Sequence, residues 1–196
     1  MSHSSSSVSF WLYPLIAVGF VVACLFGFAF GYRYPIWTLR AFRVPSSSMC
    51  PTVCNGERIF AELRGNQPYV PQRGGVILFE YGAESSLFIK RVIGIPGDTV
   101  GPGPDNTILV NGKTWQAPAV CAKSLLEGKA QIEASPTLFP VTHVAANQVF
   151  VIGDNLNYSL DSRTPHYEPI TFDKILGKPV LIYWSPESAR IGCPVQ

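Results

Sequence analysis

The hydrophobic pattern divides the chain into two parts. Residues 8–32 carry no charge and are mostly apolar, and a run of this length is sufficient to cross the hydrocarbon core of a bilayer. Aromatic residues, which favour membrane interfaces, lie at or near both ends of the run: Trp11, Tyr13, Tyr32, Tyr34 and Trp37. The pattern predicts a transmembrane helix over residues 10–32, an N-terminal tail over 1–9 and one domain over 33–196.

A cleavable signal peptide is the alternative interpretation of the apolar segment, with Ala29-Phe30-Gly31 as a small-residue cleavage site. Residues 1–9 contain neither lysine nor arginine, and the apolar run is longer than that of a typical signal peptide. Both features favour a membrane anchor that is retained.

Beyond residue 45 the pattern becomes that of short β-strands separated by glycine and proline. Strands are predicted at residues 57–63, 76–81, 87–95, 108–110, 113–115, 148–152 and 180–184. Asn111-Gly112 is a strong signal for a tight hairpin turn. Residues 116–146 are rich in alanine and proline and predict a loop-rich insertion, with a short helix near 123–133. Many short strands with such turns predict a mainly β domain, a barrel or a sandwich.

Composition and charge argue against several classes of protein. The 196 residues carry a formal net charge of +2 and no basic stripe, so a nucleic-acid partner is not expected. The chain has three histidines and no His-Glu-x-x-His pattern, so a catalytic metal is not expected either. No cofactor is predicted.

The cysteines form no metal or redox motif. Cys24 lies within the predicted span, and Cys50 and Cys54 lack the C-x-x-C spacing of zinc and dithiol sites. An exported domain has room for one disulfide. The pairing of Cys121 and Cys193 is left open by the sequence.

Residues 43–52, Arg-Val-Pro-Ser-Ser-Ser-Met-Cys-Pro-Thr, place three serines between two prolines. Pro45 and Pro51 oppose helix, because proline restricts the residue before it to extended geometry. In an extended segment alternate side chains share a face, so Ser46 and Ser48 would point the same way. One hydroxyl could then attack a substrate while the other stabilises the oxyanion. A serine- and proline-rich linker beside the membrane is the alternative.

Lys90 lies on an otherwise apolar face of a predicted strand. Its neighbours on that face are Phe88, Val92 and Gly94. Desolvation there lowers the pKa of the amine, and a neutral lysine can take a proton from a serine hydroxyl near neutral pH. The alternative is a surface pair, Lys90 and Arg91, whose stems cover apolar surface.

A third cluster of polar residues spans 153–163. Its Gly-Asp-Asn run, 153–155, predicts a turn after a strand. Ser159, Asp161 and Arg163 are spaced by two and in extended geometry would share a face. Asp161 could then pair with Arg163, while Ser159 offers a hydroxyl to orient a lysine amine. A polar turn alone would explain Gly-Asp-Asn, but not the order serine, lysine, Gly-Asp-Asn along the chain.

With these motifs in order, the chain resembles bacterial-type signal peptidase I, the serine–lysine leader peptidases, over residues 43–184. The pattern Pro-Ser-x-Ser-Met-x-Pro-Thr is met at 45–52, although Ser47 stands where the family often has glycine. Lys-Arg-x-x-Gly-x-Pro-Gly-Asp is met in full at 90–98, and Gly-Asp-Asn-x-x-x-Ser-x-Asp-Ser-Arg at 153–163.

The resemblance implies a role for each candidate residue. Ser48 would be the nucleophile and Lys90 the general base, oriented by Ser159. Ser46 and the Ser48 amide would form the oxyanion hole. Supporting residues of the site would be Asp154, Asp161 and Arg163. The resemblance also implies a signal-peptidase-like β-barrel or sandwich domain resting on the membrane surface.

The function implied is that of a membrane-anchored serine endopeptidase that removes N-terminal signal peptides from exported preproteins. Its partners would be preproteins and the lipid bilayer. It would be a single-pass protein of the inner or plasma membrane with an extracytoplasmic catalytic domain. The positive-inside rule alone would keep the domain in the cytoplasm, because Arg33, Arg40 and Arg43 follow the span. The rule weakens for long translocated domains, and access to preproteins requires the outer side.

Three alternatives stay open. After Asp-Ser-Arg the family commonly continues into an aromatic-glycine turn, whereas this chain has Thr164-Pro-His-Tyr-Glu168. This difference leaves room for a related peptidase that processes pilins in conjugation systems. A non-enzymatic, membrane-tethered β domain is the second alternative. The third is a serine–histidine–aspartate triad drawn from His143, His166, Asp154 and Asp161.

Overall fold

The computed structural model describes residues 38–65, 67–118, 121 and 139–195, together with Val18, Gly19, Val21, Val22 and Cys24. The chain divides into two compact units, residues 1–39 and 40–196. The five residues near the N-terminus are helical and exposed. Within the described ranges, no helix has the length and apolar character needed to cross a membrane. The predicted tail, 1–9, and most of the predicted span, 10–32, lie outside the described residues.

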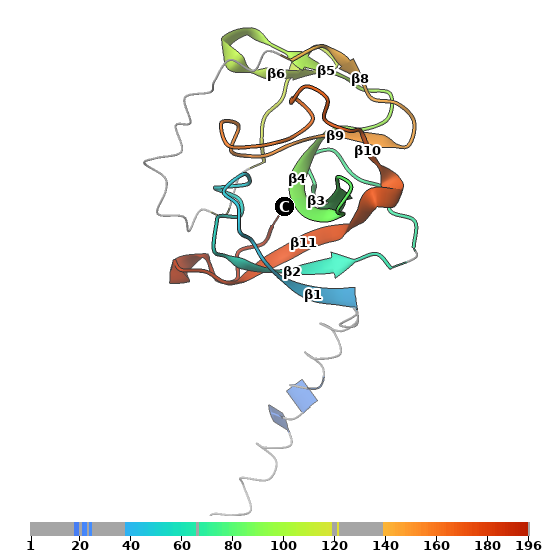
Figure 1. Ribbon diagram of the computed structural model, residues 1–196. Helices are drawn as coiled ribbons and strands as arrows, with labels where there is room; N and C mark the ends of the chain where they lie inside the picture. Colours follow the sequence, from blue (N-terminus) through green and yellow to red (C-terminus); the bar gives the residue numbers. More distant parts are fainter. Residues whose placement is uncertain are drawn as a thin grey trace, which may run out of the picture. The chain divides into compact units, whose positions relative to one another are not determined.

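The larger unit is mainly β, as predicted, and its strands form two sheets (Figure 1). The strands are β1 (Leu39–Arg43), β2 (Arg58–Leu63), β3 (Val76–Tyr81), β4 (Ser86–Gly94), β5 (Thr99–Pro102), β6 (Ile108–Val110), β7 (Lys113–Thr114), β8 (Thr142–His143), β9 (Gln148–Ile152), β10 (Ile170–Thr171) and β11 (Ile175–Trp184). Short 3₁₀ helices are η2 (Pro104–Asn106), η4 (Phe172–Lys174) and η5 (Ser188–Arg190). One sheet has the strand order β1-β2-β11-β3-β4-β9-β10 and the other β7-β6-β5-β8.

The closed barrel offered by the sequence pattern does not form within the described residues. Neither strand order returns to its first strand, so β1 and β10 are the edges of the larger sheet. The strands β7, β8 and β10 have two residues each, which is too short to extend the pairing around a closed ring. The domain is therefore built from two open sheets.

Several predicted strands lie where the pattern placed them. The β6–β7 hairpin turns at Asn111 and Gly112 with φ of 53° and 77°, as a type I′ turn requires. Strand β11 begins at Ile175, earlier than predicted. The sequence pattern missed its first residues because Gly177-Lys178-Pro179 interrupts the apolar run. Its pairing with β2 shifts register between Pro179 and Leu181, and such an irregularity accommodates a proline.

Among the described residues of the predicted loop-rich insertion, 116–146, there is one strand. Strand β8 lies within it and pairs with β5 through Thr142 and His143. The short helix predicted near 123–133 lies outside the described residues.

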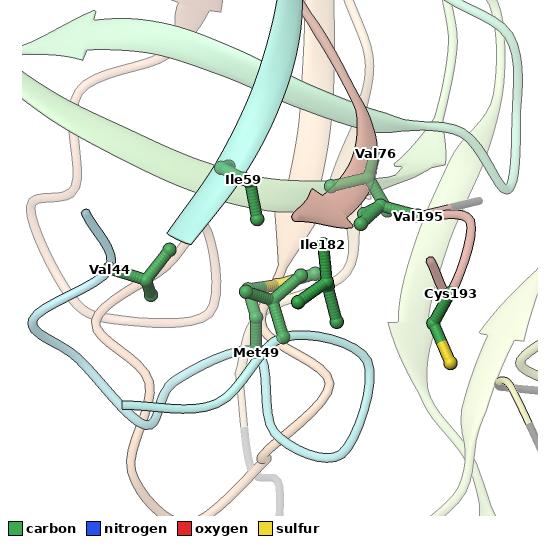
Figure 2. Close-up of a cluster of buried hydrophobic side chains, with 8 residues drawn as sticks. Val44, Met49, Ile59, Val76, Ile182, Cys193 and Val195 are labelled. Carbon is green, nitrogen blue, oxygen red and sulfur yellow. The ribbon is translucent and has the colours of Figure 1, made fainter. Parts of the chain in front are cut away.

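One of the apolar core clusters lies directly behind the candidate nucleophile. Met49 follows Ser48 in the chain, and its side chain points toward Ile182 and the other members of the cluster (Figure 2). The buried members are Val44, Met49, Val53, Ile59, Val76, Ile182, Cys193 and Val195. Burying a methionine side chain contributes roughly 2 kcal/mol. The cluster therefore packs the loop between β1 and β2, residues 44–57 and called the serine loop below, against β2 and β11.

Candidate active site

The candidate nucleophile lies in the loop between β1 and β2. Two backbone hydrogen bonds close the base of this loop, from Val44 N to Glu57 O at 2.9 Å and from Gly56 N to Val44 O at 2.8 Å. Ser48 is only 7% exposed and its neighbour Met49 is buried. The loop is fixed at its base and through Met49, and this holds Ser48 in place.

Two disulfides lie in the described residues, one more than the single bond for which the cysteine pattern left room. Cys50–Cys54 closes a ring within the serine loop, and Cys121–Cys193 joins positions separated by 72 in sequence. Cys24 is free. The even number of cysteines outside the predicted span is the signal that could have indicated both bonds.

Lys90 lies on β4, and its side chain contacts that of Ser48. Its Nζ lies 2.8 Å from Ser48 Oγ and donates a second hydrogen bond to the carbonyl oxygen of Ile89 at 3.1 Å. The Lys90 side chain is 3% exposed, and Nζ lies 5.4 Å from the ring centroid of Phe88. Burial therefore lowers the pKa of the amine to about 8, although the charges of Asp161 and Asp154 act in the opposite direction.

Ser46 lies beside Ser48, and its hydroxyl is already engaged. The backbone N–H of Ser48 donates to Ser46 Oγ at 3.1 Å. This bond brings together the two donors that an oxyanion hole would need, but it also occupies one of them. The Ser46 hydroxyl must rotate away before both groups can face an oxyanion.

Ser159 lies next to the serine loop without the expected bond to Lys90. Its Oγ is buried and has no hydrogen-bond partner within the described residues. A Cβ built on Gly153 would lie 2.3 Å from Ser159 Oγ and 2.4 Å from the carbonyl oxygen of Ser48. Gly153 therefore packs against both Ser48 and Ser159, and only glycine fits at position 153.

Asp161 and Arg163 form a two-pronged ion pair. Arg163 Nε donates to Asp161 Oδ1 at 2.8 Å, and Arg163 Nη2 donates to Asp161 Oδ2 at 2.9 Å. Oδ2 also accepts the backbone N–H of Gly153 at 3.0 Å. The extended geometry expected at Asp161 and Arg163 is wrong, because residues 161–163 form a bend and a turn between β9 and β10. The pair thus fixes the start of the turn that follows β9.

Asp154 pairs with an arginine whose role the sequence did not indicate. Arg91 donates to the two Asp154 carboxylate oxygens at 2.7 and 2.6 Å and is 1% exposed. Thr52 Oγ1 also donates to Asp154. The surface alternative for Lys90 and Arg91 is therefore wrong for both residues. The Lys-Arg dipeptide on an apolar strand was the signal that could have indicated burial of the arginine too.

Asn155 completes the attachment of the 153–155 turn to the serine loop. Its backbone N–H donates to the carbonyl oxygen of Ser48 at 3.0 Å, and its side-chain amide donates to that of Ser47 at 3.2 Å. The serine loop is thus held by Asn155 at one end and by Asp154 through Thr52 at the other.

The two histidines considered for a triad lie elsewhere. His143 is exposed, and its Nδ1 lies 2.9 Å from Thr99 Oγ1. His143 and His166 line a cavity of about 230 Å³ whose lining includes neither Ser48 nor Lys90. The carboxylates of Asp154 and Asp161 are engaged by arginines, so the triad alternative has no geometric support.

A groove of about 300 Å³ lies beside Ser48 and Lys90. Residues of β1 and β4 contribute to its walls, and most of the lining is apolar: Phe42, Val44, Pro45, Leu78, Leu87, Phe88 and Ile89. Strand β1 is an edge of the larger sheet. An edge strand can add an extended peptide by main-chain hydrogen bonds, with pockets receiving its side chains. The described residues include no group of three or more His, Cys, Asp or Glu side chains arranged to hold a metal ion.

Residues 15–184 match the model of the family described as Signal peptidase, peptidase S26. The chain is 30% identical over 176 residues to Signal peptidase IB of Staphylococcus aureus, covering 86% of each protein. It is 31% identical over 143 residues to Signal peptidase I T of Bacillus subtilis (strain 168), covering 73% of this chain and 72% of the relative. The chain therefore belongs to the signal peptidase S26 family, and it is a serine endopeptidase.

A crystal structure of a signal peptidase I from Enterococcus faecalis V583 aligns with a TM-score of 0.42 at 24% identity. The alignment covers 57% of this chain and 98% of that one.

Proposed function

We propose that this chain is a membrane-anchored endopeptidase that removes N-terminal signal peptides from exported preproteins, with Ser48 as nucleophile and Lys90 as general base. The observation that carries the proposal is the 2.8 Å separation of Lys90 Nζ and Ser48 Oγ in a buried site. The names of the relatives, signal peptidases, support the substrate class.

Acylation begins with proton transfer within the dyad. A neutral Lys90 amine takes the Ser48 proton while Oγ attacks the carbonyl carbon of the scissile bond. The carbonyl oxygen becomes an oxyanion, and the Ser48 N–H and the rotated Ser46 hydroxyl donate to it. The carbon–nitrogen bond then breaks, and protonated Lys90 gives its proton to the leaving amine. The mature protein leaves, and the signal peptide stays esterified to Ser48.

Deacylation repeats the sequence with water. Lys90 takes a proton from a water molecule, which attacks the ester carbonyl, and the proton then returns to Ser48 Oγ as the ester bond breaks. The products are the signal peptide with a free carboxylate and the regenerated Ser48 hydroxyl. One residue can therefore serve as base and acid in both halves of the reaction.

Burial makes Lys90 suitable for this role. With a pKa of about 8, roughly a tenth of the enzyme holds a neutral amine at pH 7. Asp154 and Asp161 favour the charged amine, but each carboxylate is paired with an arginine, Arg91 or Arg163. Desolvation is therefore the dominant influence on Lys90.

The apolar groove is the proposed binding site for the signal peptide. The residues before the cleaved bond would lie extended along β1, with their small side chains in the groove that Phe42, Leu87 and Phe88 line. The scissile carbonyl would then reach Ser48 at the groove.

The proposed location is the outer side of the membrane, with a single N-terminal span. Two disulfides in the catalytic unit support an oxidising compartment. Preproteins expose their cleavage sites on that side, so the domain must lie there to reach them. The arginines that follow the predicted span point to the opposite topology, and translocation of a long domain can override their effect.

A dedicated pilin-processing peptidase is the second candidate. The observation that favours it is the stretch Thr164–Glu168, which departs from the family pattern. The experiment for both candidates is to incubate the purified chain in detergent with several preproteins and a pilin precursor. Cleavage of many preproteins supports the first candidate, cleavage of the pilin precursor alone supports the second, and cleavage of none contradicts both.

A further inference from the structure

Residues 185–195 follow the region that the family model matches, 15–184. This segment packs against the serine loop. Several contacts attach this segment firmly to the domain. The Ile182 N–H donates to the Cys193 carbonyl oxygen at 2.9 Å, and Leu181 forms a β-bridge with Pro194. The side chain of Cys193 belongs to the core cluster that also buries Met49 (Figure 2).

This segment carries a buried arginine, Arg190, that reaches Glu57. Arg190 is 2% exposed and Glu57 is 1% exposed. Arg190 Nε donates to Glu57 Oε1 at 2.5 Å, and Nη2 donates to Oε2 at 3.1 Å. Ser185 Oγ also donates to Glu57 Oε1, at 2.9 Å.

Both members of the pair hold the backbone of the serine loop. Glu57 Oε2 accepts the backbone N–H of Cys54 at 2.7 Å, and Arg190 Nη2 donates to the carbonyl oxygen of Thr52 at 3.1 Å. The side chain of Thr52 donates to Asp154 on the other side of the loop. Arg190 therefore holds the same loop residue that the Gly-Asp-Asn turn holds.

The energetics of the pair favour a geometric role over a stabilising one. Replacing a buried ion pair by apolar side chains of similar volume is often neutral or stabilising, because desolvation offsets the attraction of the charges. Arg190 Nη1 is also buried without a hydrogen-bond partner among the described residues, which is a further cost. What the pair supplies is a fixed geometry, because two parallel hydrogen bonds orient Arg190 and Glu57 relative to one another. Arg190 then holds the Thr52 carbonyl oxygen and Glu57 holds the Cys54 N–H.

We propose that Arg190 is a positioning residue for catalysis, acting through Glu57 and Thr52 to hold Ser48 at its distance from Lys90. This inference rests on the proposed role of Ser48. A misplacement of about 1 Å in an active site lowers the rate by on the order of 10²-fold. Loss of the fork should therefore lower kcat and leave KM nearly unchanged, because Arg190 does not line the groove.

The test compares Arg190→Lys, Arg190→Met and the double variant Glu57→Met/Arg190→Met in the full-length chain. Rates on a preprotein are divided by the folded fraction, measured by circular dichroism at the assay temperature. We expect kcat to fall by on the order of 10- to 100-fold in all three. The double variant should melt close to the wild type and still be slow. Its pH–rate profile should keep the wild-type midpoint, since no hydrogen bond joins Arg190 to Lys90 in the described residues.

Arg64→Met is the matched control. Arg64 is half-buried and also donates to backbone carbonyl oxygens, those of Gln67 and Asp173, but neither of these residues belongs to the serine loop. It should keep the wild-type kcat.

A wild-type kcat in the folded double variant would overturn the inference. If that variant does not fold, Arg190→Lys decides: a folded Arg190→Lys protein with wild-type kcat overturns it, and one with reduced kcat and unchanged KM supports it. Ser48→Ala is assayed alongside. Activity in that variant would reject the proposed function, whereas an inactive Ser48→Ala with normal Arg190 variants would reject the positioning role alone.

Discussion

Gly153 packs so closely against the carbonyl oxygen of Ser48 that a Cβ atom on it would lie 2.4 Å from that oxygen. The same Cβ would lie 2.3 Å from Ser159 Oγ. The added Cβ would meet backbone on one side and a buried side chain on the other, so rotation of the Ser159 side chain alone cannot make room for it. The contact therefore sets the distance between the turn after β9 and the serine loop.

Gly153→Ala should displace the serine loop and inactivate the enzyme. We expect kcat to fall by on the order of 10²-fold, with destabilisation of roughly 1–3 kcal/mol from overpacking. Steady-state kinetics and urea unfolding measure the two effects. Gly112→Ala is the control, since φ at Gly112 is 77° and no atom lies within 4 Å of the added Cβ. It should lose about 1 kcal/mol of stability and no activity. Equal kcat in the two variants would contradict the proposed contact.

The two serine hydroxyls should differ in how much their loss costs. Ser48→Ala should abolish turnover without unfolding, because it removes the attacking oxygen and little packing. Ser46→Ala should retain measurable turnover, since loss of one oxyanion donor costs on the order of 3 kcal/mol in the barrier. Cleavage of a purified preprotein followed by gel electrophoresis separates the two. His166→Ala serves as control and should match the wild type; an inactive, folded His166→Ala protein would revive the triad.

The buried lysine should cost the fold stability. The pKa of Lys90 falls from 10.5 to about 8 on folding. Below pH 8 the amine is charged in both states, and the folded state bears the full cost of burying the charge. Between pH 8 and 10.5 the unfolded state binds more protons, so this cost declines and stability rises by up to ~3 kcal/mol.

Lys90→Met should therefore be more stable than the wild type at pH 7 and should lack the rise between pH 8 and 10.5. Urea unfolding at several pH values measures both properties. Lys178→Met is the control, because Lys178 is half exposed and pairs with Glu62 at 3.5 Å. It should follow the wild-type curve. A Lys90→Met protein less stable than the wild type at every pH would show that the amine is not a destabilising charge.

The local chemistry of the site was predictable where it depended on neighbours in the chain. Lys90 stood out because it is charged on an apolar strand, and its pKa and contact with Phe88 follow from that environment. The proline-bracketed loop pointed to Ser46 and Ser48, and the side chain of Ser46 does contact the backbone N–H of Ser48. The family patterns then placed all of these residues in one site.

Long-range partners were beyond the sequence pattern. Arg91 and Arg190 each reach a carboxylate far along the chain, Asp154 or Glu57, and no local pattern indicates which carboxylate each arginine will meet. The same limit applies to the pairing of the disulfides. The extended geometry assumed for Asp161 and Arg163 failed because side-chain hydrogen bonds of Asp161 favour a turn over a strand.

The proposed topology can be tested in cells with a C-terminal tag on the chain. Protease added to intact spheroplasts should digest the tagged domain, since the domain is proposed to lie outside the membrane. On a gel without reductant, the tagged chain should also migrate differently before and after treatment with a reductant. The two disulfides are expected to form in an oxidising compartment, and reduction breaks them. If the tag is digested only after lysis, the domain faces inward and general processing of preproteins cannot be its job.

The pH dependence of kcat/KM for the wild type, measured beside Lys90→Arg, tests the Ser48–Lys90 dyad most directly. A base with a pKa of about 8 predicts a rate that rises tenfold per pH unit below pH 8 and levels off above it. Lys90→Arg keeps a cation that cannot deprotonate, so it should be inactive at every pH although it folds. A wild-type rate that does not change from pH 6 to 9, or a folded Lys90→Arg protein with comparable activity, would contradict the dyad.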